Sequence, residues 1–131
     1  MSLWHLYQDV AFISYQPFAK DSCFAIISVL NPRGKIATPG QNLCRHMAFA
    51  ARVHAARLRY RKITGASGDL KFLEPSWAVF CSREQAEQYA LEWQQNALYW
   101  VEQDQLWLLP ALLQHEPVVL GRFSERLILA P

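Results

Sequence analysis

Three adjacent amide side chains, Gln94, Gln95 and Asn96, stand between two aromatic patches in the stretch "EWQQNALYW". An amide group both donates and accepts hydrogen bonds, so it can recognise polar groups on a ligand, but it is poorly suited to acid–base catalysis. Amides are costly to bury unless each finds a partner. The same groups can act structurally by donating to the free carbonyl groups at the end of a helix.

The charged residues are divided unequally along a chain whose formal net charge is +2. No acidic residue lies between Asp21 and Asp69, and most of the acids follow Asp69. Four basic residues on or near the first predicted helix could contact the phosphates of a nucleic acid: Arg45, Arg52, Arg59 and Lys62. The alternative is that an acidic second helix packs beside the first and neutralises these charges. The net charge is also far below that of typical nucleic-acid-binding domains.

A reactive thiol and a metal site are two further chemistries to consider. Cys81 precedes the predicted cap of the second helix, where the helix dipole lowers the pKa of a thiol. A nucleophile also needs a base within reach, and the placement of the histidines supplies none, so we expect Cys81 to be a small buried residue. Cys44 and His46 are two residues apart on a helix and point in different directions. No metal ligand set and no cofactor motif is therefore predicted.

Periodic patterns predict the elements that must position these groups. Two capping-box spacings, from Thr38 to Gln41 and from Ser82 to Gln85, predict helices over 38–58 and 83–93. Alternating or β-rich stretches predict strands over 9–15, 23–30, 60–67, 75–82, 96–103 and 105–112, with a final edge strand or pair in 117–131. The predicted buried stripe of the first helix consists of Leu43, Met47, Ala50, His54 and Leu58.

These elements describe one α+β domain over residues 1–131, with enough length and a sufficient hydrophobic fraction, 52%, to form a core. The middle of the predicted order, β-α-β-β-α-β, is that of a ferredoxin-like, split βαβ layer. We expect a mainly antiparallel sheet with two main helices on one face and extra N- and C-terminal strands. No apolar run approaches the ~18 residues of a spanning helix, and no secretory signal is recognisable. Three scattered cysteines favour the reducing cytoplasm.

A series of spaced motifs resembles a known family. The motifs are "FAIISVLNPRG", "QN" at the first helix, "GAS", "EPSWAV" and "WQQNALYWV". In this order they resemble the uncharacterised bacterial family called domain of unknown function 3293, over roughly residues 4–113. Trp93 and Gln94 depart from the usual Phe and Gly of that family, and a Gly at the second position would permit a left-handed helix cap. The resemblance implies a fold and a set of marked positions, but no reaction.

The resemblance and the predicted loops together mark eight candidate ligand-binding residues. They are Asn31, Arg33, Asn42, Arg45, Glu74, Ser76, Gln95 and Asn96. If the loop before the first helix and the loop after the second helix converge, these side chains would surround a small polar pocket. The alternative is that they only cap turns and helix ends.

We therefore expect a non-catalytic binding domain for a polar or anionic ligand, either a nucleotide-like small molecule or a nucleic acid. A first alternative is an enzyme that acts on a nucleotide-like substrate with Glu74 as the general base. A second alternative is a protein-interaction or homodimerisation module that uses the aromatic side chains of the final strands, Tyr99, Trp100 and Trp107. No association with a membrane is expected.

Overall fold

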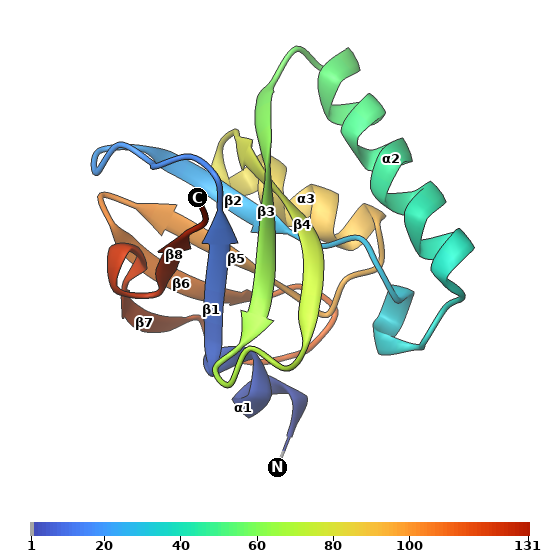
Figure 1. Cartoon of the computed structure of the whole chain (residues 1–131). Helices are drawn as coiled ribbons and strands as arrows, with labels where there is room; N and C mark the ends of the chain where they lie inside the picture. The colour runs from blue at the N-terminus through green and yellow to red at the C-terminus, as the bar shows by residue number, and fades with distance from the viewer. Residues whose placement is uncertain (1) are drawn as a thin grey trace.

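The computed structural model describes residues 2–131 and shows a mixed α+β fold built on a curled sheet (Figure 1). The α-helices in these residues are α1 (Leu3–Gln8), α2 (Pro39–Ala55) and α3 (Arg83–Glu92). The strands are β1 (Val10–Ser14), β2 (Cys23–Ile27), β3 (Arg59–Ser67), β4 (Leu73–Phe80), β5 (Ala97–Glu102), β6 (Gln105–Pro110), β7 (Val118–Arg122) and β8 (Leu127–Leu129). Two short 3-10 helices are η1 (Pro32–Gly34) and η2 (Phe123–Glu125). No helix in this part of the chain is long and apolar enough to cross a membrane.

Both long helices begin at the predicted capping boxes. The Thr38 hydroxyl accepts a hydrogen bond from the Gln41 amide, and the Gln41 side chain accepts one from the Thr38 amide. Ser82 and Gln85 repeat the arrangement at the start of α3. Each box satisfies two amide groups that have no partner within the helix, so the two helix starts are fixed by local sequence.

The helix α2 ends at Ala55, before the predicted end, and this changes the position of one candidate arginine. Arg57 takes a left-handed conformation with φ of 61°, and its amide donates to the His54 carbonyl at 2.9 Å. The chain leaves the helix at this point. Arg59 is therefore the first residue of β3 rather than a helix residue, and it does not share a helix with Arg45 and Arg52.

The helix α2 also buries a different face from the predicted one. Of the predicted stripe only Ala50 is buried, and the others are half-buried or exposed: Leu43, Met47, His54 and Leu58. Phe49 and Val53 are fully buried in its place. The helix is oriented by β4, because the Trp77 indole stacks on the His46 ring and donates to the His46 carbonyl at 3.0 Å. This contact between elements outweighs the apolar pattern of the helix itself.

The eight strands form one sheet in the order β7-β6-β5-β2-β4-β3-β1-β8. All neighbours are antiparallel except β1 and β8, which are parallel. In the centre, β4 lies between β2 and β3, and β2 lies between β4 and β5. The mixed α+β class is therefore as predicted. The curled eight-stranded sheet is larger than the predicted layer, and its description as ferredoxin-like remains a prediction.

The two edges of the sheet are brought together at the C-terminal end of the chain, because η2 joins β7 on one edge directly to β8 on the other (Figure 1). Arg126 strengthens this closure. Its guanidinium donates to the carbonyls of Gln8 at 2.8 Å and Val10 at 3.1 Å, and to the carbonyl of Leu120 at 3.0 Å. The start of β1 is thereby tied to β7, and the sheet curls around an interior.

Alternate residues of each strand face two separate cores, as the pleat of a sheet requires. Phe24 and Ile26 of β2 belong to the core inside the curl, whereas Ala25 and Ile27 belong to the core that contains α2 and α3. The interior core is dominated by aromatic side chains, several of which stack or meet edge to face: Phe12, Phe18, Phe24, Phe80 and Phe123.

Candidate functional site

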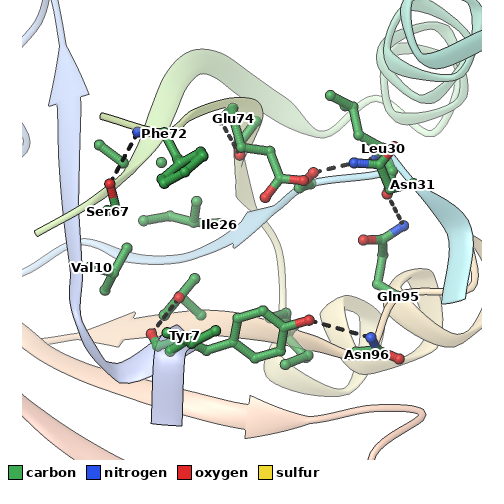
Figure 2. Close-up of a pocket in the computed structure, with 18 of the residues that line it drawn as sticks. Tyr7, Val10, Ile26, Leu30, Asn31, Ser67, Phe72, Glu74, Gln95 and Asn96 are labelled. Atoms are coloured by element: carbon green, nitrogen blue, oxygen red, sulfur yellow. Dashed lines mark hydrogen bonds between the residues drawn. The ribbon is translucent and has the colours of Figure 1, made fainter. Parts of the chain in front are cut away.

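A cavity of about 600 Å³ opens at one end of the curled sheet. Its walls come from the beginnings of β1, β4 and β5, the ends of β2 and β3, and the helix α1. Because neighbouring strands are antiparallel, the beginnings of β1, β4 and β5 lie at the same end of the sheet as the ends of β2 and β3. The aromatic core fills the interior beyond them. Figure 2 shows polar side chains that reach into this space from opposite walls. The cavity is within the size range of sites for small molecules.

The loop between β2 and α2 is built around a pair of asparagines. Asn42 Oδ1 accepts from the Asn31 amide at 2.9 Å, and Asn42 Nδ2 donates to Asn31 Oδ1 at 2.9 Å. Asn31 Oδ1 also accepts from the Ala37 amide at 3.0 Å. These bonds hold Asn31 in a left-handed conformation with φ of 47°, which asparagine tolerates better than most residues. Both asparagines line the cavity while they stabilise the loop.

The loop between α3 and β5 lies against the first loop, because the Arg33 amide donates to the Gln94 carbonyl at 2.7 Å. Gln94 takes a left-handed conformation with φ of 59° and ends the helix, although glycine adopts this conformation more readily. Gln95 is buried, and its Nε2 donates to the carbonyls of Leu30 and Trp93, both at 3.1 Å. Of the three adjacent amides, Gln95 is the one that donates to a free carbonyl at this helix end.

The orientation of the Gln95 amide follows from its two acceptors. Both hydrogens of Nε2 are directed at main-chain carbonyls, and the reversed orientation would place the amide oxygen against two carbonyl oxygens. The oxygen Oε1 is thus the group that Gln95 presents to a ligand, and Figure 2 shows it directed toward the space between Glu74 and Tyr7. Gln95 contributes an acceptor to the cavity.

Two tyrosines and Asn96 form the wall next to α1. Asn96 Nδ2 donates to the Tyr7 hydroxyl at 3.3 Å, and the Tyr99 hydroxyl donates to the Tyr7 carbonyl at 2.6 Å. Burial raises the pKa of Tyr99 strongly, and the neighbouring Glu74 and Tyr7 raise it further. Tyr99 is therefore a neutral donor at physiological pH, fixed on the main chain of α1.

Glu74 stands on β4 opposite this wall, and its carboxyl group points into the cavity (Figure 2). The residue as a whole is exposed to solvent, but the cavity walls surround the carboxyl group, and this desolvation raises the pKa of Glu74. A hydrogen bond with the Ser28 side chain acts in the opposite direction. Ser76, two residues further along β4, is buried and donates to the Glu74 carbonyl at 3.1 Å.

The cavity thus brings together six of the eight candidate ligand-binding residues: Asn31, Asn42, Glu74, Ser76, Gln95 and Asn96. Arg33 and Arg45 are not among the lining residues. Arg33 is exposed, and only its main-chain amide takes part in the joining of the loops. Arg45 is directed at main-chain carbonyls: Nε donates to Val29 at 2.7 Å and Nη2 to Trp93 at 2.5 Å.

The other candidates for a nucleic-acid surface differ in their surroundings. The Arg52 guanidinium lies 3.8 Å from the Glu92 carboxylate of α3 and over the Tyr89 ring, so the predicted pairing of α2 with the acidic helix occurs at this point. Arg59 on β3 lies over the Phe80 ring. Lys62 is exposed on β3, beside His46, whose pKa is lowered by burial and by this lysine.

The thiol and the aromatic strands have structural surroundings. Burial raises the pKa of Cys81 to about 11, which outweighs the predicted effect of the helix dipole and leaves the thiol unreactive. Trp100 is buried, and Tyr99 and Trp107 are half-buried, so these side chains do not present a free apolar face. Among residues 2–131, no three side chains of His, Cys, Asp or Glu lie close enough to hold a metal ion.

Five polar lining residues were not among the predicted ligand-binding residues: Tyr7, Asp9, Ser28, Ser67 and Tyr99. Two of them belong to α1 or its C-terminal cap, and α1 itself was missed because a helix of six residues is too short to show periodicity. The available signal was the N-cap serine, whose hydroxyl accepts from the His5 amide at 3.3 Å. Ser28 and Tyr99 were hidden inside apolar strands, where the pleat alone decides which side they face.

One comparison with known proteins gives a match. The family model described as protein of unknown function (DUF3293) matches residues 27–98, which is more than half of the chain. No curated protein and no solved structure gives a significant match.

Proposed function

This chain belongs to the family of proteins of unknown function DUF3293, and we propose that it is a small-molecule-binding domain whose polar ligand occupies the cavity at the open end of the curled sheet. The matched residues 27–98 include all six candidate residues that line the cavity and also Ser28. The segment that defines the family therefore contains much of the polar wall of the cavity, whereas Tyr7, Asp9 and Tyr99 lie outside it.

The observation that carries the proposal is the convergence of two distant loops around the cavity. Asn31 and Gln95 are far apart in sequence, yet both line it, and the Gln95 side chain donates to the carbonyl of Leu30. Their side chains are already held by main-chain partners, so they would lose little conformational entropy when a ligand binds. A rigid concave site with a few oriented polar groups is the usual form of a small-molecule site.

Substitutions at Gly65 test the proposal without replacing any polar side chain of the cavity. Gly65 lines the cavity, and a Cβ there would lie 3.7 Å from the Glu74 carbonyl and 3.8 Å from Ser76 Oγ, in ordinary contact. Gly65→Leu should project a branched side chain into the cavity and obstruct it, whereas Gly65→Ala adds one methyl group and is the matched control. Compounds from a metabolite library should raise the melting temperature of the wild type and of Gly65→Ala, but not of Gly65→Leu. A library without stabilising compounds, or equal stabilisation of Gly65→Leu, would contradict the proposal.

An enzyme with Glu74 as the general base is the second candidate function. The observation that favours it is a carboxyl group inside a cavity with a raised pKa, since a raised pKa moves a carboxylate toward the range useful for a base. Any turnover found with a nucleotide-like substrate should be lost in Glu74→Gln while the circular dichroism spectrum is unchanged. Turnover that survives this substitution would exclude Glu74 as the base.

Nucleic acid and a second copy of the chain are weaker candidates as partners. The arginines expected to contact phosphate are separated and have protein partners, and the aromatic residues expected at a dimer face are partly or fully buried. We expect no gel shift with single- or double-stranded DNA and a monomeric mass in light scattering.

We also propose that β2, α2, β3, β4, α3 and β5 form a ferredoxin-like unit with both helices on one face. The strand order β5-β2-β4-β3 and the antiparallel pairing support this assignment. Side chains of both helices share one core with β2, β4 and β5, and the rings of Phe49 and Tyr89 meet edge to face at 5.5 Å. An experimental structure would test it directly.

A cytoplasmic location is likewise proposed from the cysteines. Cys23, Cys44 and Cys81 are all free thiols, and two of them are exposed, which suits a reducing compartment. Fractionation of cells that express the chain with its own termini would test the location, and a fraction that carries oxidised Cys23 and Cys44 would contradict it.

A further inference from the structure

We propose that the ligand of this cavity carries a positively charged, hydrogen-bond-donating head group, such as a primary ammonium, on a compact apolar body. This inference rests on the proposed function and deepens it. The sequence alone predicted a polar or anionic ligand. The inference keeps the polar ligand and excludes the anionic one, because the charged groups that line the cavity are carboxylates.

The charge of the lining is the first argument. Asp9 and Glu74 both line the cavity, and no Lys, Arg or His of residues 2–131 does so. The guanidinium of Arg126 is close enough to influence Tyr99, but it donates to three main-chain carbonyls. An anion placed between two carboxylates would be repelled without compensation, whereas a cation would be attracted to both.

The direction of the hydrogen bonds is the second argument. Gln95 donates both hydrogens of Nε2 to the main chain and has only Oε1 to offer. Asn96 donates through Nδ2 to the Tyr7 hydroxyl, and Tyr99 donates its hydroxyl hydrogen to the Tyr7 carbonyl. The Glu74 carboxylate adds two acceptor oxygens on the opposite wall (Figure 2). The cavity is therefore richer in acceptors than in donors, and an ammonium group, which only donates, matches it.

The remainder of the lining is apolar and determines what the head group is attached to. Ile26 and Leu98 lie deep in the wall and are buried, whereas Leu6 and Phe72 stand at the solvent side. Phe72 is 76% exposed, which is unusual for a large apolar residue on a cavity rim. A ring or short alkyl chain beside the ammonium group would cover these side chains and gain from their removal from water.

Three probes of similar shape and different charge test the inference: 2-phenylethylamine, 2-phenylethanol and phenylacetate. They are titrated at pH 7 while ¹H–¹⁵N spectra follow the side-chain amides of Gln95 and Asn96. The amine should bind at least about tenfold more tightly than phenylacetate, which corresponds to one charge-assisted hydrogen bond and the loss of one repulsion. Glu74→Gln should remove about tenfold of the amine affinity, and Glu84→Gln on exposed α3 is the matched control.

The outcomes separate the inference from the proposed function. Binding of phenylacetate as tight as that of the amine, abolished by Gly65→Leu, would overturn the charge preference and leave the cavity as a binding site. Amine affinity that is equal in the wild type and in Glu74→Gln would also overturn it. The inference also fails if no probe produces shifts of the Gln95 or Asn96 amide signals that Gly65→Leu removes. A library screen without stabilising compounds would then contradict the proposed function as well.

Discussion

Replacement of Arg45 distinguishes a structural arginine from a ligand-binding one. Arg45→Met keeps the length of the aliphatic chain and much of its contact with the Trp93 ring, over which the guanidinium lies at 5.5 Å. It removes the bonds to the carbonyls of Val29 and Trp93. The Trp93 carbonyl keeps Gln95 Nε2 as a donor, so mainly the Val29 carbonyl loses its charged partner.

The expected loss of stability follows from this inventory. A hydrogen bond from a charged donor contributes about 1.5–3 kcal/mol, and the partial exposure of Arg45 places it near the lower end of that range. With a smaller loss at Trp93, the free energy of unfolding should fall by about 2 kcal/mol. For a chain of 131 residues this corresponds to a decrease of about 7 °C in melting temperature.

Urea denaturation followed by tryptophan fluorescence measures the effect, with Arg52→Met as the control. Arg52 is exposed and its ion pair with Glu92 is 3.8 Å long, so its replacement should cost less than about 1 kcal/mol. If the two variants differ by less than about 0.5 kcal/mol, the guanidinium of Arg45 does not hold the loops together. Arg45 would then again be a candidate for contact with a ligand or a nucleic acid.

Three further outcomes are expected. The raised pKa of Glu74 means that the folded state binds the carboxyl proton more tightly than the unfolded state, so the group favours folding below the unfolded pKa of 4.5, and this advantage is lost as the pH rises through the folded pKa. Parallel urea titrations should therefore show that Glu74→Gln gains stability relative to the wild type between pH 4 and pH 7. If the difference in unfolding free energy between the two proteins does not change with pH, the carboxyl group of Glu74 is not desolvated. Iodoacetamide at pH 8 should label exposed Cys23 long before Cys81, because a pKa of about 11 leaves roughly one Cys81 thiol in a thousand ionised. Mass spectrometry of tryptic peptides measures the labelling, and equal rates at the two cysteines would contradict the raised pKa of Cys81. Phe12→Ala should lower the unfolding free energy by about 3–5 kcal/mol because Phe12 is fully buried, whereas Phe72→Ala at the exposed rim should lower it by less than about 1 kcal/mol. Thermal melts that give similar losses for the two variants would contradict the assignment of the interior core.

Local signals were sufficient for most of the secondary structure. The capping boxes at Thr38 and Ser82 specify both long helix starts with side-chain and main-chain atoms only three residues apart. The central strands follow from apolar alternation for the same reason. The helix face was not predictable in this way, because Trp77, distant in sequence, determines how α2 lies on the sheet.

The sequence was sufficient to predict the amide side chains of the candidate site, but not the positions of its charged side chains. Asparagine and glutamine at helix and strand ends are recognisable because few other residues satisfy the main chain there, and Asn31, Asn42 and Gln95 all do so beside the cavity. Arg45 lies outside the cavity lining because its guanidinium donates to main-chain carbonyls, and such partners leave no mark in a pattern of side chains. The curl of the sheet was missed for a related reason, since it depends on Arg126 and on a pairing between the first and last strands.

The parallel pairing of β1 with β8 places Phe12, which lines the cavity, opposite Leu127, so the strand that carries part of the cavity wall has a neighbour very distant in sequence. All the strands between them must therefore be synthesised before β1 can acquire its second neighbour, and until then that strand has an unpaired edge exposed to other nascent chains. Folding that awaits such a distant partner is slow, because a long segment of chain must be closed before the contact forms, and loss of β8 would leave this edge of β1 free to pair with other chains.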